Sequence, residues 1–214
     1  MQKWINIDKI LVSAQKKQQE LLVTLTAIIL VTVGYSMWEY RVKANIKQAS
    51  IAYYHTIQQK EKIHTKESIH KLESITQDYP STVYSQLAHA RLAKIDFENK
   101  KYRSAAKHYE IAISYMQENN LKSLFKLRLA KIYLHEHEPK KALDTLRSVN
   151  TDSFKYIKAI TEIDAHIQLK DYSKAQESIS THLKHEEAKE GQTKNGESMI
   201  FRELLQQRQR KIKA

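Results

Sequence analysis

The feature that most constrains how this chain can fold is an apolar segment that runs without a charged residue from Leu21 to Trp38. A helix rises about 1.5 Å per residue, so the eighteen residues of this segment span roughly 27 Å, close to the thickness of a bilayer's hydrocarbon core. Aromatic rings lie at its C-terminal end, where they favour the membrane–water interface. The segment predicts a transmembrane helix over residues 21–40, which contacts membrane lipid through Leu21, Leu22, Leu25, Ile28, Ile29, Leu30, Val31, Val33, Tyr35 and Trp38.

Two other interpretations of this segment stay open. A buried core helix usually carries polar residues on one face, whereas the polar residues here are Thr and Ser, whose hydroxyls can bond to their own helix. A cleaved signal peptide would need a small-x-small cleavage site, which the residues from Tyr35 to Tyr40 do not offer. We therefore expect an uncleaved membrane anchor.

The charges that flank the segment predict its orientation. The basic residues before it are Lys3, Lys9, Lys16 and Lys17, and those soon after it are Arg41, Lys43 and Lys47. The positive-inside rule places the more basic flank in the cytoplasm, and the difference here is small. We expect residues 1–20 to be a cytoplasmic N-terminal segment and the large domain to lie outside the cytoplasm.

The composition predicts a helical protein with a basic surface. The 214 residues carry a net charge of +12 and include three Gly, two Pro and no Cys, so no disulfide forms. So few glycines argue against strand-and-turn folds and Gly-rich phosphate loops, because Gly supplies the positive φ angles of tight turns. The basic residues are mixed with acidic ones, which fits anionic lipid or acidic protein partners better than nucleic acid. They are concentrated only near the C-terminus, as either a binding patch or a solvated helix face, at Arg202, Arg208, Arg210, Lys211 and Lys213.

An internal repeat follows the apolar segment. The string Arg91–Ile95 recurs unchanged as Arg128–Ile132, thirty-seven residues later. A small residue recurs with it, at Ser68, Ala105, Ala142 and Ala175. Periods of this length are typical of helical solenoids, in which each unit buries its apolar face against its neighbour.

Each repeat reads as a pair of helices, and the small residues allow the two backbones to approach where the helices cross. The predicted pairs are near Ala44 to Asp78, 82–99 with 102–117, 122–137 with 140–149, and 152–169 with 173–185. The fold class is therefore all-α: an N-terminal transmembrane helix followed by an α-solenoid of about four helix pairs over residues 41–186. The residues expected to pack in the repeat core are Leu72, Leu92, Ala93, Tyr102, Ala105, Tyr109, Ala112, Leu129, Ala130, Tyr133, Ala142, Leu146, Tyr172 and Ala175.

The chain changes character after His185. Residues 187–198 are polar, contain two of the three glycines and predict a linker. Residues 199–214 return to helical spacing and predict a C-terminal capping helix, because the end of a solenoid needs a cover with a polar outer side. The apolar residues available to one face of this helix are Met199, Leu204 or Leu205, and Ile212.

These spacings resemble the tetratricopeptide repeat, through Leu92, Ala93, Tyr102 and Ala105 in one copy and the corresponding residues in the next. A single N-terminal span followed directly by four such repeats is similar to the YfgM-type ancillary subunits of the SecYEG translocon. The segments that carry this resemblance are Gly34–Tyr40, Asp78–Tyr84, Ala90–Lys94 and Leu127–Tyr133. Here the N-terminal segment and the C-terminal end differ from the family, whose members are acidic there.

The resemblance implies a location and partners. It implies a bacterial inner-membrane protein that crosses the membrane once, with a periplasmic repeat domain. It also implies binding to the SecYEG translocon and to a membrane-anchored periplasmic chaperone, so that secretory or envelope proteins pass to folding factors. An envelope scaffold for cell-wall or outer-membrane assembly is the alternative, and sequestration of a signalling protein is a third.

The sequence does not predict an enzyme, and no cofactor or metal is expected. The densest histidine cluster is His135-Glu136-His137-Glu138, but residues two apart on a helix point away from each other. His182 and His185 share a helix face, yet their surroundings match no zinc pattern. No nucleophile elbow or phosphate loop occurs in the sequence.

Overall fold

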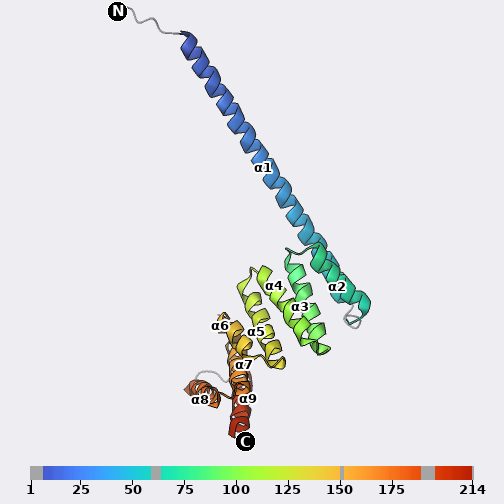
Figure 1. The fold of residues 1–214 in the computed structure, drawn as a ribbon, viewed down its shortest axis with the longest axis vertical. Helices are drawn as coiled ribbons and strands as arrows, with labels where there is room; N and C mark the ends of the chain where they lie inside the picture. The colour runs from blue at the N-terminus through green and yellow to red at the C-terminus, as the bar shows by residue number, and fades with distance from the viewer. Residues whose placement is uncertain (1–6, 59–63, 150–151, 189–195, 214) are drawn as a thin grey trace, which may run out of the picture. The chain divides into compact units, whose positions relative to one another are not determined.

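The structure is a computed structural model that describes residues 7–58, 64–149, 152–188 and 196–213. All regular elements in these ranges are helical (Figure 1). They are α1 (Ile7–Gln58), α2 (Lys66–Asp78), α3 (Val83–Glu98), α4 (Tyr102–Tyr115), α5 (Asn119–His135), α6 (Pro139–Arg147), the 3-10 turn η2 (Asp152–Phe154), α7 (Lys155–Gln168), α8 (Tyr172–Ala188) and α9 (Gly196–Lys213). The chain divides into two compact units, Met1–Gln48 and Ala49–Ala214.

The first unit consists of most of α1, a helix of 52 residues that includes the apolar segment. The hydroxyls of Thr24, Thr26 and Thr32 donate hydrogen bonds of 2.8 to 2.9 Å to carbonyls three or four residues earlier. These bonds satisfy the polar groups of the segment within its own helix, as the sequence predicts. Neither Gly nor Pro follows Gly34 before Gln58, so α1 continues into the second unit without a break.

The second unit contains the repeats, and its helices pack mainly against their neighbours in the chain. The sequence predicts three of the four pairs: α3 pairs with α4, α5 with α6 and α7 with α8. The expected first pair differs, since α2 packs mainly against α3. Local sequence fixes several ends. The Thr82 hydroxyl accepts a hydrogen bond of 3.2 Å from the Ser85 backbone and caps α3, and Pro139 stands in the first turn of α6.

The turn inside each pair repeats one backbone geometry without glycine. Lys100, His137 and Lys170 have φ angles of 59°, 57° and 60°, each two residues before the second helix of its pair. In each turn the next backbone N–H reaches back to a carbonyl five residues earlier, at 2.8 to 2.9 Å. This is the left-handed helix ending that usually takes Gly, so the scarcity of glycine did not exclude such turns here.

Three groups of buried side chains hold the second unit together. One joins α2 to α3 through Leu72, Ile75 and Leu92. The largest runs from α3 to α7 and includes Phe125 and Ala165, and the third joins α7, α8 and α9. The aligned small residues lie inside these groups, since Ala105, Ala142 and Ala175 have no exposed surface.

The C-terminal part differs from its prediction. Residues 187–188 belong to α8 and 196–198 to α9, so the predicted linker is shorter at both ends, and its middle lies outside the described residues. The expected face of α9 is also partly wrong. Met199 is 64% exposed, whereas the expected Leu205 is buried against α7 and α8 together with Phe201, which was not expected there. Phe201 stands four residues before Leu205, and this spacing could have identified it.

Polar contacts fix α9 at both ends. The buried Glu186 carboxylate of α8 accepts hydrogen bonds from the Ser198 hydroxyl and, at 3.3 Å, from the Tyr156 hydroxyl of α7. Near the other end, Arg208 donates two bonds of 2.9 Å to the carboxylate of Asp164. A two-bond guanidinium–carboxylate pair fixes orientation as well as distance, so α9 has a defined position on the unit.

Candidate functional site

Helices α3, α5, α7 and α9 form a surface with several hollows, and we call it the A face. The first three are the first helices of their repeats. Three hollows open on this face: one where α3 and α4 meet α5, and two where α5, α7 and α9 meet.

The repeated string explains the chemistry of the A face. In Arg91–Ile95 and Arg128–Ile132, the central Leu, Ala and Ile are at most 5% exposed. Lys94 and Lys131 are exposed, because they follow the buried Ala by about a quarter of a helix turn. The repeat therefore places a cation at the same position on α3 and on α5.

The hollow beside α3 is rimmed by cations and floored by apolar side chains. Its volume is about 320 Å³, and Phe97 and Ile132 contribute to its lining together with Lys94 and Lys131. The Arg128 guanidinium also lines it and donates a hydrogen bond of 3.4 Å to the Tyr109 hydroxyl. That bond keeps the guanidinium against the wall of the hollow.

The hollow between α7 and α9 is lined mainly by apolar side chains. Its volume is about 310 Å³. Ile157 and Ile200 line it although they are 41% and 62% exposed, so apolar surface is available at its mouth. Phe201 and Leu204 form its deeper wall on the α9 side.

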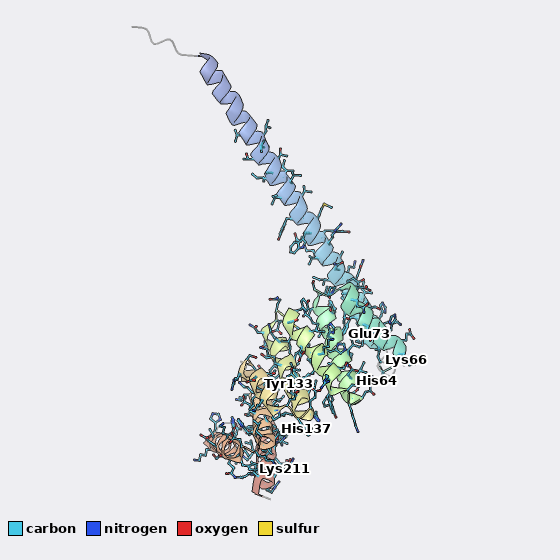
Figure 2. The ribbon with its side chains drawn as sticks, in the orientation of Figure 1. His64, Lys66, Glu73, Tyr133, His137 and Lys211 are labelled. Carbon is cyan, nitrogen blue, oxygen red and sulfur yellow. The ribbon has the colours of Figure 1, made fainter. Side chains whose placement is uncertain are left out.

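The third hollow lies beside the Arg208–Asp164 ion pair and has a volume of about 360 Å³. Lys211 lies on its α9 side and His135 on its α5 side. Figure 2 labels Lys211 on the last turns of α9. Lys131 lines this hollow as well as the two others. The Lys131 side chain therefore borders all three hollows.

The predicted core residues can be compared with their positions in the second unit. Leu72, Leu92, Ala93, Ala105, Tyr109, Ala112, Leu129, Ala130, Tyr133, Ala142, Leu146 and Ala175 are buried. Tyr102 is half-buried, and its ring packs against those of Phe97 and His135, with centroids 5.3 and 5.2 Å away.

The prediction for Tyr172 is wrong, since its side chain is 45% exposed. Tyr172 is the counterpart of Tyr102 in the last repeat. Tyr102 is covered because the following first helix, α5, ends in His135. Five residues before Tyr172 the chain has Ile167, whereas five residues before Tyr102 it has Phe97. The last repeat therefore lacks one of the aromatic neighbours that cover Tyr102.

A partly buried polar contact joins α4 to α5. The Tyr133 hydroxyl donates a hydrogen bond of 2.5 Å to the Glu110 carboxylate. Burial and this bond to a carboxylate raise the pKa of Tyr133 well above its usual range, so the phenol stays protonated. Figure 2 labels Tyr133 among the helices of the repeat unit. The contact is structural, because it holds two repeats in register.

The histidines form pairs rather than clusters. His89 of α3 and His108 of α4 place their Nδ1 atoms 3.0 Å apart, and His108 Nε2 is 3.7 Å from the Asp96 carboxylate. Burial, with repulsion from His108, lowers the pKa of His89 to about 4, so this ring is neutral at neutral pH. Within the described ranges, no three His, Asp or Glu side chains converge as metal ligands would.

The apolar segment of α1 has the opposite character to the repeats. All ten residues predicted to contact lipid are between 51% and 72% exposed. In the part of the chain that the structure describes, one helix is long and apolar enough to cross a membrane, with a mean hydropathy of 1.9 and none of its apolar window buried. A core helix would be mostly buried, so that interpretation does not fit. A signal sequence near the N-terminus passes the same test of length and composition.

Comparison with known proteins identifies the family. The model of the tetratricopeptide repeat-like domain matches residues 15–211, which is most of the chain. The protein therefore belongs to the tetratricopeptide repeat-like domain family, whose repeats generally serve as protein-interaction modules rather than catalysts. No curated protein and no solved structure matches the chain.

Proposed function

We propose that this protein is an interaction protein anchored in a bacterial inner membrane through Leu21–Trp38. The observation that carries this proposal is the contrast between a fully exposed apolar helix segment and a repeat unit with an open, hollowed A face. An anchor concentrates the repeat unit near membrane-bound partners, so that modest contacts suffice for binding.

We further propose the orientation and the partners. The N-terminus is cytoplasmic and the repeat unit periplasmic, as the lysines before the span favour. The partners are the SecYEG translocon and a membrane-anchored periplasmic chaperone, and the protein helps secretory or envelope proteins reach folding factors. The resemblance to YfgM-type subunits supports this assignment, and membership of the repeat family supports a protein partner in general.

Crosslinking of the full-length protein in its native membrane, followed by mass spectrometry, tests the partners. Translocon subunits and a periplasmic chaperone should be recovered above a control that carries the span alone. Recovery of cell-wall synthases or outer-membrane assembly proteins in their place would favour the envelope scaffold. The absence of translocon subunits, under conditions in which another translocon partner crosslinks, would contradict the proposal.

Two further experiments test which part of the protein makes the contacts and on which side of the membrane the repeat unit lies. Replacing Leu21–Trp38 with an unrelated apolar span should preserve the crosslinks if the repeat unit makes the contacts. Protease added to spheroplasts should digest the repeat unit while the N-terminal segment stays protected. Digestion only after lysis would place the repeat unit in the cytoplasm and exclude a periplasmic chaperone as its partner.

A further inference from the structure

The turn between α3 and α4 carries a cluster of cations that the corresponding turns of the next two repeats do not have. Residues 100–107 contain four cations and no acidic residue. The equivalent windows, 137–144 and 170–177, each contain two cations and two carboxylates. The three turns share one backbone geometry, so they differ in charge rather than in shape. We call the first of them the basic turn, and its cations are Lys100, Lys101, Arg103 and Lys107.

The charge of the basic turn is not neutralised within the part of the chain that the structure describes. All four side chains are exposed, and none of them forms an ion pair with a carboxylate of those residues. The carboxylates near the end of α3 have other partners. Asp96 accepts a hydrogen bond from the Ser104 hydroxyl, and the Glu98 carboxylate lies 3.7 Å from the Lys94 ammonium. The positive charge of the basic turn is therefore available to an anion outside the chain.

The equivalent turns show what local stability favours at this place. Glu138 and Asp171 stand where the basic turn has Lys101, and they lie 2.5 and 2.9 Å from the ammonium groups of Lys141 and Lys174. Asp171 also accepts a hydrogen bond of 3.4 Å from the Lys174 backbone, whereas Lys101 makes no side-chain cap on α4. Acidic residues stabilise the start of a helix and cations do not. A break of such a local rule is expected where a surface serves another purpose.

The chemistry of the basic turn fits an extended anionic surface. Its four cations line none of the three hollows of the A face, so they offer charge without a pocket that encloses a ligand. Clusters of four or more Lys and Arg are typical of contacts with anionic lipid headgroups, to which each basic residue adds attraction. The anchor keeps the chain at a bilayer, so headgroup phosphates are the anions held at high local concentration.

We propose that the basic turn binds the anionic headgroups of a phospholipid membrane. Its Lys and Arg side chains pair with lipid phosphates, and this contact attaches the repeat unit to a membrane independently of α1. The inference takes from the proposed function only the membrane anchor, and it does not depend on the translocon or the chaperone.

The test uses the full-length protein in nanodiscs of zwitterionic lipid and measures its binding to separate vesicles by co-flotation. Vesicles of phosphatidylcholine mixed with phosphatidylglycerol should carry the protein, whereas vesicles of phosphatidylcholine alone should not. Empty nanodiscs give the background. Binding should weaken as the salt concentration rises, because dissolved ions screen exposed charges.

Arg103→Glu and Lys140→Glu form a matched pair of variants. Both residues are exposed, they occupy equivalent positions in neighbouring turns, and their replacement changes the net charge equally. Arg103→Glu should weaken vesicle binding at least about fivefold, which is the contribution of one basic residue near an anionic membrane. Lys140→Glu should leave it unchanged. Equal losses in both variants would show that the net charge alone attracts the vesicles and would overturn the proposal.

Lys101→Asp separates binding from stability. This replacement introduces the acidic residue that Asp171 provides in the last of the three turns, so the melting temperature should not fall. Vesicle binding should still decrease at least about fivefold. A structural role alone would not move the two readouts in this way, and vesicle binding as tight as in wild type would remove the basic turn as the lipid contact.

Two further results would overturn the proposal. The first is the absence of co-flotation with the anionic vesicles. The second is binding of soluble polyphosphate that depends on Arg103, with no binding of vesicles, which would identify a polyanion other than lipid as the occupant. Crosslinking to the translocon is a separate readout. Its loss with vesicle binding intact would remove only the proposed partner, and the loss of vesicle binding with crosslinks intact would remove only this inference.

Discussion

The apolar segment of α1 and helix α5 contain similar apolar residues, but the protein uses them in opposite ways. Ile29 is 52% exposed in the middle of the segment, whereas Phe125 and Leu127 of α5 are 1% and 2% exposed. In α5 the apolar residues alternate with Lys122, Lys126 and other cations, so one face can meet water. The segment has no such face. The pattern of apolar residues, more than their number, decides whether a helix is covered by protein or needs lipid.

The largest expected effect of a substitution comes from removing a buried ring in α5. Phe125→Ala leaves a cavity in the largest core group, and such truncations cost about 3–5 kcal/mol of unfolding free energy. Chemical denaturation of the full-length protein in detergent, monitored by far-UV circular dichroism, would measure this loss of unfolding free energy.

Two truncations serve as controls for that experiment. Tyr115→Ala removes a ring that is 53% exposed, and Ile29→Ala shortens a side chain in the apolar segment. Neither should lower the stability of the repeat unit comparably. If Ile29→Ala destabilised the repeat unit as much as Phe125→Ala, the apolar segment would be part of a protein core and the comparison would fail.

The next effect concerns the small residues at the helix crossings. Ala105 has no exposed surface where α4 packs on its neighbours, so Ala105→Leu should overpack the site and cost about 1–3 kcal/mol. Arg103→Leu, at an exposed position on the same helix, is the control. An unchanged melting temperature for Ala105→Leu would mean that the repeats are aligned on the wrong residue.

A smaller effect is expected on lowering the pH. The pKa of His89 is depressed to about 4 in the folded protein, below its ordinary value of 6.5, and burial also lowers the pKa values of His108 and His182. Between these two values the unfolded chain binds more protons than the folded one, so stability should fall as the pH falls from 6.5 towards 4.

Melts across this pH range would measure that dependence. His89→Gln should flatten it, because its side chain takes up no proton in the unfolded state, while His108 and His182 leave some dependence in place. An equal slope in wild type and His89→Gln would contradict the pKa assignment.

The smallest effect comes from the left-handed turns. Lys100→Gly should stabilise the repeat unit by about 0.5–1 kcal/mol, because the positive φ angle is strained for residues with a Cβ atom. Lys107→Gly, inside α4, should destabilise by a similar amount, about 1 kcal/mol. Destabilisation by both replacements, measured as a shift in denaturation midpoint, would show that Lys100 is not strained.

Much of this fold could be predicted from the sequence because its signals are local. An unbroken apolar run, a string repeated at a fixed period and a proline after Asp78 each specify structure within a few residues. The burial of Tyr102 depends on His135, which comes from the next helix pair, and no local pattern around Tyr172 shows whether it has such a partner. The missed burial of Phe201 is different, because its spacing to Leu205 is a local signal.

The features of the A face also divide into those that local sequence predicts and those that depend on distant residues. The two cations at Lys94 and Lys131 follow from the repeated string, so their common face could be inferred from helical spacing. The pairing of Arg208 with Asp164 joins residues 44 positions apart, and no local pattern announces it. The hollow between α7 and α9 depends likewise on how α9 packs, which the sequence indicates only through Phe201 and Leu205.

The central claim is that the apolar segment is covered by lipid while the repeat unit stands in water, and spin-label accessibility tests it most directly. The chain has no Cys, so Ile29→Cys and Ile200→Cys each provide a single labelling site. In nanodiscs containing the full-length protein, the label at 29 should collide with dissolved oxygen and be shielded from a water-soluble nickel chelate. The label at 200 should show the reverse. Equal access of the nickel chelate to both labels would contradict the claim.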